Sequence, residues 1–314
     1  QMCIRDRLYK AAAAVAFRMF VYRFLPLSML VLRMGALRHR ESSRMLPMPV
    51  PGGWVKYSMA AGLAQQTYCR ENWIGMRVGD ATLLWQYGDG AHRQRVMLFD
   101  SASLGLAVAF MGTNLSSMHS MMHDLVALPV VPNVRYRCML PPSARVFAGF
   151  QGAYVPLADA VKHEVLYQAE RLNRERVTVI GHSLGAAMAL LAALHLHSVV
   201  GVSEVITFGL PRTGNRAFAS AIDSVFGDRF HFVVNGKDPV PHLAPRFLGY
   251  QHPSNLIWIN PGNSDQWMLY PGQENVHGMQ RALPVLSSHH HNGVYFHTRI
   301  GASDGYCPAR VATE

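Results

Sequence analysis

The residues best suited to chemistry surround one serine in a glycine-flanked turn. The motif Gly181-x-Ser183-x-Gly185 follows the β-branched segment Val177–Ile180 and precedes the apolar run Leu184–His197. A sharp turn from strand to helix leaves the serine hydroxyl exposed at its tip. The backbone N–H of Leu184, at the start of the helix, can then donate to an oxyanion. The pattern predicts that Ser183 is a nucleophile; the alternative is an ordinary tight turn.

A nucleophilic serine needs a carboxylate that orients its base, and Asp238 is the favoured candidate. It follows the apolar segment Phe230–Val234, which reads as a strand. A carboxylate just past the end of a parallel strand lies at the same sheet edge as Ser183. Its role would be to hold the tautomer of a histidine and to stabilise the imidazolium. The alternative is a loop aspartate that makes a turn before Pro239.

The base is expected among the histidines that follow Asp238, because imidazole accepts and releases a proton near neutral pH. The order Ser, Asp, His along the chain is that of α/β-hydrolases. His291, shortly before Tyr295, is the first choice and His290 the second. The other candidates are His289 and His297, whereas His242 and His252 come too soon after Asp238.

Alternating strands and helices must position these residues. Strands are expected at Ala81–Tyr87, Arg95–Phe99, Leu104–Phe110, Arg145–Phe147, Val177–Ile180, Val205–Phe208, Phe230–Val234 and Leu256–Ile259. Helices are expected at Tyr57–Cys69, Val155–Asn173 and Leu184–His197. This alternation predicts an α/β protein of the α/β-hydrolase type, with a mostly parallel central sheet and helices on both faces.

Several longer motifs resemble the fungal-type, or class 3, lipases from about Tyr57 to Cys307. They are Ala107–Thr113, Arg145–Phe150, Gly181–Ala186, Phe208–Asn215 and Asp238–Leu243, in the order found in that family. The resemblance implies that Thr113 is a second oxyanion-stabilising residue. Three positions depart from the family pattern: Met111 replaces Arg, Phe147 replaces His and Ala186 replaces Gly.

The resemblance implies a lipid ester substrate bound at a lipid–water interface. A methionine-rich segment after Thr113 fits a lid and acyl-binding surface: Leu115, Met118, Met121 and Met122. Such an amphipathic helix would cover the site in water and lie on lipid when open; a core-packed helix is the alternative. The expected activity is that of a triacylglycerol lipase acting through an acyl-enzyme. Phospholipase A1, a feruloyl-type esterase and a catalytically silent lipid- or protein-binding scaffold are the alternatives.

The charge distribution divides the chain of 314 residues. Its net charge is +10, of which residues 1–45 carry +7. Residues 1–53 are therefore expected to be a basic, apolar leader with a Pro-Gly linker, and residues 54–314 the catalytic domain. The leader's longest uncharged run, Phe24–Leu32, is too short to span a membrane. It suits a signal peptide, a transit peptide, a membrane anchor or an ordinary helical extension.

The basic, apolar leader points to secretion or membrane association in the secretory pathway, with mitochondrial or other organelle targeting as the alternative. The basic excess belongs to the leader, and no nucleic-acid-binding motif is present, so nucleic acid is not an expected partner. Four cysteines are present, and their spacing leaves the pairing open. No CxxC or clustered ligand pattern occurs, so neither a metal nor a cofactor is expected.

Overall fold

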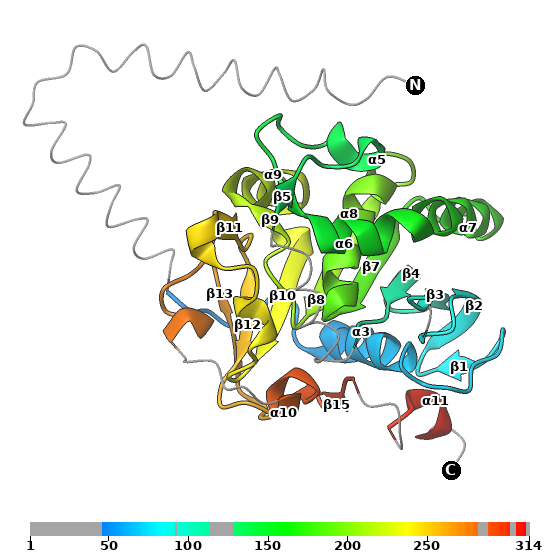
Figure 1. The fold of residues 1–314 in the computed structure, drawn as a ribbon. Helices are drawn as coiled ribbons and strands as arrows, with labels where there is room; N and C mark the ends of the chain where they lie inside the picture. Colours follow the sequence, from blue (N-terminus) through cyan, green and yellow to red (C-terminus); the bar gives the residue numbers. More distant parts are fainter. Residues whose placement is uncertain (1–45, 92, 114–127, 282–287, 302–305, 312–314) are drawn as a thin grey trace, which may run out of the picture. The chain divides into compact units, whose positions relative to one another are not determined.

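The strand that precedes Ser183 lies in the middle of a nine-stranded sheet. The computed structural model describes residues 46–91, 93–113, 128–281, 288–301 and 306–311. The strand order is β1-β2-β3-β4-β7-β8-β10-β12-β13 (Figure 1). Neighbouring strands from β4 to β12 are parallel, and those outside them are antiparallel. The strands are β1 (Arg77–Val78), β2 (Ala81–Tyr87), β3 (Val96–Ser101), β4 (Gly105–Phe110), β7 (Val177–His182), β8 (Val202–Phe208), β10 (Phe230–Asn235), β12 (Leu256–Ile259) and β13 (Trp267–Tyr270).

The central strands are apolar throughout because both faces of the sheet are covered. In β4, Leu106, Val108 and Phe110 belong to one hydrophobic core, whereas Ala107 and Ala109 belong to another. This follows from the two-residue period of a strand, which sends successive side chains to opposite faces. A strand buried on both sides therefore loses the polar–apolar alternation that marks a half-exposed one.

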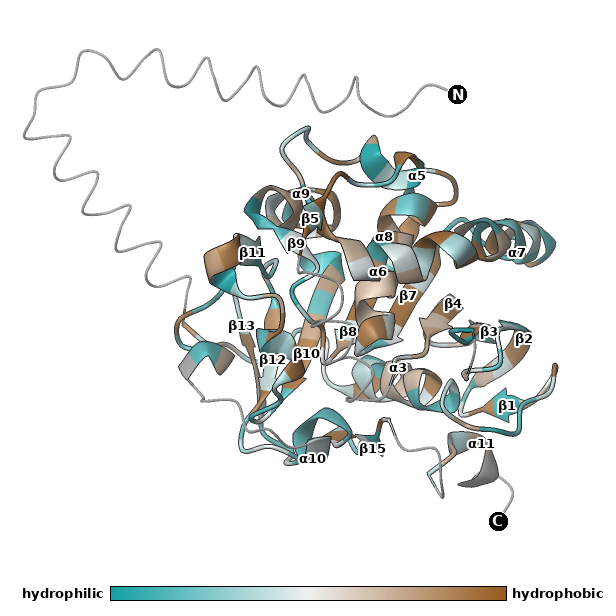
Figure 2. Cartoon of the chain, in the orientation of Figure 1, coloured by the Kyte–Doolittle hydropathy of each residue, from teal (hydrophilic) through white to brown (hydrophobic). Residues whose placement is uncertain are grey.

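Helices supply the cover on each face. The described helices are α3 (Val55–Gln66), α5 (Val134–Arg137), α6 (Ala148–Tyr154), α7 (Ala158–Arg171), α8 (Leu184–His197), α9 (Arg216–Phe226), α10 (Ser288–His291) and α11 (Pro308–Val311). Side chains of α6, α7, α8 and α9 join the first core, and those of α3 join the second. Every residue of α8 from Leu184 to Leu196 is buried, whereas α7 shows polar residues on its outer face (Figure 2).

A smaller sheet and a hairpin are not hydrogen-bonded to the nine-stranded sheet as further strands. The small sheet has the order β11-β9-β6-β5, with β5 (Pro129–Val130), β6 (Val146–Phe147), β9 (Gly214–Asn215) and β11 (Tyr250–Gln251). The hairpin pairs β14 (Val294–Tyr295) with β15 (Thr298–Arg299). The described residues also form short 3-10 helices: η2 (Val155–Leu157), η3 (Gly227–Arg229), η4 (Val240–His242), η5 (Arg246–Leu248) and η6 (Met279–Arg281).

The predicted fold class is confirmed, with a mostly parallel central sheet and helices on both faces. The predicted bounds of β2, β12 and α8 coincide with the observed ones, whereas α6, α9 and β13 were not predicted. The division of the chain at residue 53 stays a prediction; Met48 forms an antiparallel bridge with Leu269 of β13. None of the described helices is long and apolar enough to cross a membrane.

One disulfide joins distant parts of the described chain. Cys69, just after α3, is bonded to Cys307, 238 residues later in the sequence. Cys138, at the end of α5, is exposed. The cross-link ties the C-terminal segment before α11 to the turn that follows α3. Because that turn carries Tyr68, the disulfide lies close in sequence to a residue that reaches the candidate active site.

Candidate active site

Ser183 occupies a strained turn between β7 and α8. Its backbone has φ 61° and ψ −129°, a left-handed conformation that non-glycine residues rarely adopt. The turn closes tightly: a Cβ on Gly181 would lie 2.2 Å from the carbonyl oxygen of Gly185, and one on Gly185 would lie 2.2 Å from that of Phe110. Both flanking positions therefore require glycine. Strain of this kind persists where the surrounding structure holds it, typically at functional sites.

The structure brings the three predicted residues together. His291 Nε2 lies 2.8 Å from Ser183 Oγ, and His291 Nδ1 lies 2.9 Å from Asp238 Oδ2. The exposed fractions of Ser183, Asp238 and His291 are 0%, 0% and 1%. A buried carboxylate on Nδ1–H leaves the lone pair of Nε2 facing the hydroxyl, as a general base requires. The arrangement can therefore move a proton from the serine hydroxyl to the imidazole.

The topology explains why these residues converge. β7, β8 and β10 are adjacent parallel strands, so their C-terminal ends lie at one edge of the sheet. Ser183 follows β7, and Asp238 follows β10. His291 comes from α10, whose backbone is held by Asn235 at the end of β10: Asn235 Nδ2 donates to the carbonyl oxygen of His290 at 2.9 Å. The sequence analysis assigned no role to Asn235.

Asp238 is oriented by two further groups. The backbone N–H of Val240 donates to Oδ1 at 2.9 Å, and the Tyr295 hydroxyl lies 3.3 Å from Oδ2. Burial raises the pKa of Tyr295 well above its usual value, and the negative charge of Asp238 raises it further. Tyr295 thus stays protonated as a donor. Its single proton serves either Asp238 or the carbonyl oxygen of His291, 3.1 Å away.

The contact between His291 and Asp238 depends on Gly209, which directly follows β8. Its φ is +56°, and a Cβ there would lie 2.8 Å from His291 Cε1, 2.9 Å from His291 Nδ1 and 3.1 Å from Asp238 Oδ2. Real Cβ atoms do not approach other heavy atoms so closely, so only glycine leaves room for the imidazole. Sequence reasoning placed Gly209 inside a family-like motif, without a role.

A buried ion pair holds the loop that follows Asp238. Arg212 Nε and Nη2 donate to the carboxylate of Glu274 at 2.6 and 3.1 Å, and Arg212 Nη1 donates to the carbonyl oxygen of His242 at 3.0 Å. Burial acts to raise the pKa of Glu274, but the hydrogen bonds and charge of Arg212, with His252, outweigh it and lower that pKa to about 2. The loop containing Asp238 is thereby anchored to this charged pair. Arg212 lies in the motif Phe208–Asn215, whereas the sequence analysis assigned no role to Glu274.

The structure also places the second choice for the base and the two predicted oxyanion residues, but not the predicted lid. The ring of His290, the second choice for the base, faces away from Ser183: its Nδ1 accepts from the N–H of Lys237 at 3.2 Å. Leu184 is the first residue of α8 and is buried. Thr113 follows Gly112, where a Cβ would lie 2.7 Å from Ser183 Cβ. The predicted lid residues, Leu115 to Met122, lie outside the described residues.

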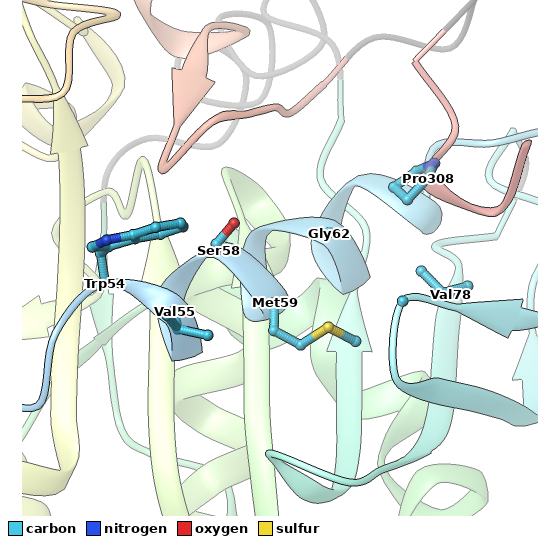
Figure 3. A pocket seen from close by; sticks show the side chains of 8 residues that line it. Trp54, Val55, Ser58, Met59, Gly62, Val78 and Pro308 are labelled. Atoms are coloured by element: carbon cyan, nitrogen blue, oxygen red, sulfur yellow. The ribbon is translucent and has the colours of Figure 1, made fainter. Parts of the chain in front are cut away.

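A groove on the outer side of α3 is separate from this site. It has a volume of about 250 Å³ and is lined mainly by apolar residues, including Trp54, Val55, Met59, Val78 and Pro308 (Figure 3). Its lining contains no member of the Ser183–His291–Asp238 cluster. The groove therefore contributes nothing to the geometry described above.

Several known proteins are similar to this chain. A family model described as Lipase (class 3) matches residues 107–248. A secreted mono- and diacylglycerol lipase of Malassezia globosa is 52% identical over 88% of this chain and 92% of its own length. One from Malassezia restricta is 42% identical over 95% and 99%. The crystal structure of a lipase from Rhizopus microsporus var. chinensis superposes with a TM-score of 0.67 and 26% identity, over 81% of this chain and 91% of that chain.

Proposed function

The chain belongs to the class 3 lipase family of carboxylic ester hydrolases, and from this premise we propose that it hydrolyses acylglycerols through an acyl-enzyme on Ser183. One observation carries the proposal. An unbroken hydrogen-bond chain runs from Ser183 Oγ through His291 to Asp238, with distances of 2.8 and 2.9 Å. The whole chain of groups is buried, so solvent does not compete for these hydrogen bonds.

The reaction follows from that geometry. His291 Nε2 takes the hydroxyl proton as Ser183 Oγ bonds to the ester carbonyl carbon. The N–H groups of Leu184 and Thr113 are the proposed donors to the oxyanion. The bond to the glycerol oxygen then breaks, and that oxygen receives the proton from His291. Water, deprotonated by His291, next adds to the acyl carbon, releasing the fatty acid and restoring the Ser183 hydroxyl.

The proposed substrates are mono- and diacylglycerols. The support is the similarity to the Malassezia proteins, whose names state that activity, and the extent of that similarity, which reaches 52% identity over most of both chains. The sequence alone favoured triacylglycerols, which remain the second candidate. The same relatives are named as secreted. Secretion of this chain is accordingly part of the proposal, and the Cys69–Cys307 disulfide suits an oxidising compartment.

A fluorophosphonate probe and defined acylglycerols test the proposal. Wild-type protein should be labelled, Ser183→Ala should not, and fatty acid should be released faster from monoolein and diolein than from triolein. His291→Ala should lower kcat by at least about 10⁴-fold. His290→Ala is the matched control and should stay within about threefold of wild type. Absence of labelling would instead support a silent scaffold, and faster release from triolein would restore the second candidate.

A further inference from the structure

The hydroxyl of Tyr68 lies between two parts of the candidate active site. The backbone N–H of Gly112 donates to Tyr68 Oη at 3.0 Å, and Tyr68 Oη lies 2.6 Å from His182 Nδ1. Gly112 directly precedes Thr113 in the turn proposed to bind the oxyanion. His182 directly precedes Ser183. One phenolic oxygen thus joins the oxyanion turn to the end of β7, directly before the nucleophile.

The direction of each hydrogen bond in this cluster follows from the charge state of His182. Burial, together with the neighbouring His291, lowers the pKa of His182 well below its usual value, so the ring is neutral and carries one N–H. Its Nε2 lies 3.0 Å from the carbonyl oxygen of His291, which can only accept. The proton is therefore on Nε2, Nδ1 accepts from the Tyr68 hydroxyl, and Tyr68 Oη accepts from Gly112.

His182 also supports the ring of His291. The two imidazoles are stacked, with centroids 4.6 Å apart and an interplanar angle of 29°. The hydrogen bond from His182 Nε2 to the carbonyl oxygen of His291 holds the backbone of the same residue. Both the ring plane and the main chain of the proposed base are thus in contact with one neutral histidine.

Tyr68 is itself held from outside the active site. The next residue, Cys69, is disulfide-bonded to Cys307. The guanidinium of Arg95 donates to the carbonyl oxygens of Thr67 and Cys69, on either side of Tyr68. The turn after α3 is therefore cross-linked and hydrogen-bonded, and the tyrosine hydroxyl is presented from a fixed position.

We propose that Tyr68 is a positioning residue that aligns the oxyanion turn with Ser183 and, through His182, orients His291. This inference rests on the proposed function, because it assigns a role relative to the triad and the oxyanion donors. Without the hydroxyl, the Gly112 N–H and His182 Nδ1 lose their partners inside the protein. The turn and the imidazole then relax away from the geometry that the transition state requires, so the loss should appear in kcat.

Tyr68→Phe tests the role with a soluble ester, p-nitrophenyl butyrate. We expect kcat to fall roughly 10- to 100-fold, as for the loss of one or two buried hydrogen bonds, with KM changed less than twofold. Tyr57→Phe is the matched control, since it removes another buried α3-region hydroxyl that has no hydrogen-bond partner among the described residues. Its kcat should stay within twofold of wild type. An equal kcat for the two variants would overturn the proposal.

Variants of His182 test the second arm. His182→Gln keeps an amide N–H for the carbonyl oxygen of His291, whereas His182→Leu removes that donor. A positioning role predicts a kcat at least about 10-fold higher for the glutamine variant than for the leucine variant, measured below both melting temperatures. Equal kcat values would show that this hydrogen bond does not orient His291, and the role assigned to His182 would be wrong.

The rate of inactivation by a p-nitrophenyl alkylphosphonate separates this inference from the proposed function. If the wild-type protein is not phosphonylated, the proposed function itself fails. If wild type and Tyr68→Phe are phosphonylated at equal rates, the nucleophile stands but Tyr68 has no positioning role. The expected result is fast labelling of wild type and of Tyr57→Phe, and labelling of Tyr68→Phe slowed in proportion to its kcat.

Discussion

Replacing Gly209 by alanine should disable the triad by steric displacement alone. The new methyl carbon would lie 2.8 Å from His291 Cε1 and 2.9 Å from His291 Nδ1. Relaxed contacts between such atoms are about 3.5 Å or longer, so the imidazole or the glycine backbone must move by roughly 0.7 Å. The same methyl would lie 3.1 Å from Asp238 Oδ2, so it crowds the carboxylate as well as the imidazole. The two groups therefore cannot move together toward the methyl to keep their hydrogen bond.

The size of the effect follows from that displacement. Misplacing a catalytic group by about 1 Å can cost on the order of 100-fold in rate. We therefore expect kcat/KM of Gly209→Ala to fall roughly 30- to 100-fold. The positive φ of +56° adds a separate cost in stability of about 1–2 kcal/mol, because alanine in left-handed backbone is strained. The two costs are distinguishable because only the first affects turnover.

Gly227→Ala supplies the control. Gly227 also has positive φ, +52°, but a Cβ there meets no atom within 4 Å. Both variants should show lower melting temperatures, whereas only Gly209→Ala should lose turnover of p-nitrophenyl butyrate. If kcat/KM of the two variants agreed within threefold, the claim that Gly209 makes room for the His291–Asp238 contact would be refuted.

Three further predictions concern stability. Burial is the main cause that lowers the pKa of three histidines to about 4: His195, His231 and His252. The unfolded chain binds protons at these histidines from about pH 6.5 downward, whereas the folded chain does so only near pH 4. The free energy of unfolding should therefore be highest above pH 6.5 and should fall by up to about 3 kcal/mol per histidine as the pH drops to 4. Urea titrations that give the same free energy of unfolding at pH 7.5 and pH 4.5 would contradict this. Arg212→Met should cost about 3–5 kcal/mol by leaving Glu274 buried without its cation, and Arg212→Met/Glu274→Leu should regain part of that loss; chemical denaturation measures both. Cys69→Ser with Cys307→Ser should lower the free energy of unfolding by about 2–5 kcal/mol, and dithiothreitol should lower the melting temperature of this variant less than that of wild type.

Local patterns along the chain were sufficient to predict the fold class and two of the three residues in the candidate active site, Ser183 and Asp238. The glycine-flanked serine between an apolar strand and an apolar helix has a local cause, the sharp turn from β7 into α8. Asp238 was reached through the rule that parallel strands end at one edge. Elements with weaker periodicity, such as α6 and β13, were missed because their burial depends on neighbours far away in sequence.

Tertiary structure decided which histidine meets Ser183. His289, His290 and His291 have the same local signals, and they lie on the single turn of α10, where successive side chains point about 100° apart. Only the docking of that turn, held by Asn235, selects His291.

The same reason applies to Tyr68 and Gly209. Tyr68 contacts His182, 114 positions away in the sequence. The need for glycine at position 209 comes from His291 and Asp238, which a side chain there would contact too closely. Sequence patterns record the chain's local preferences, whereas such contacts exist only once the sheet has brought distant segments to one edge.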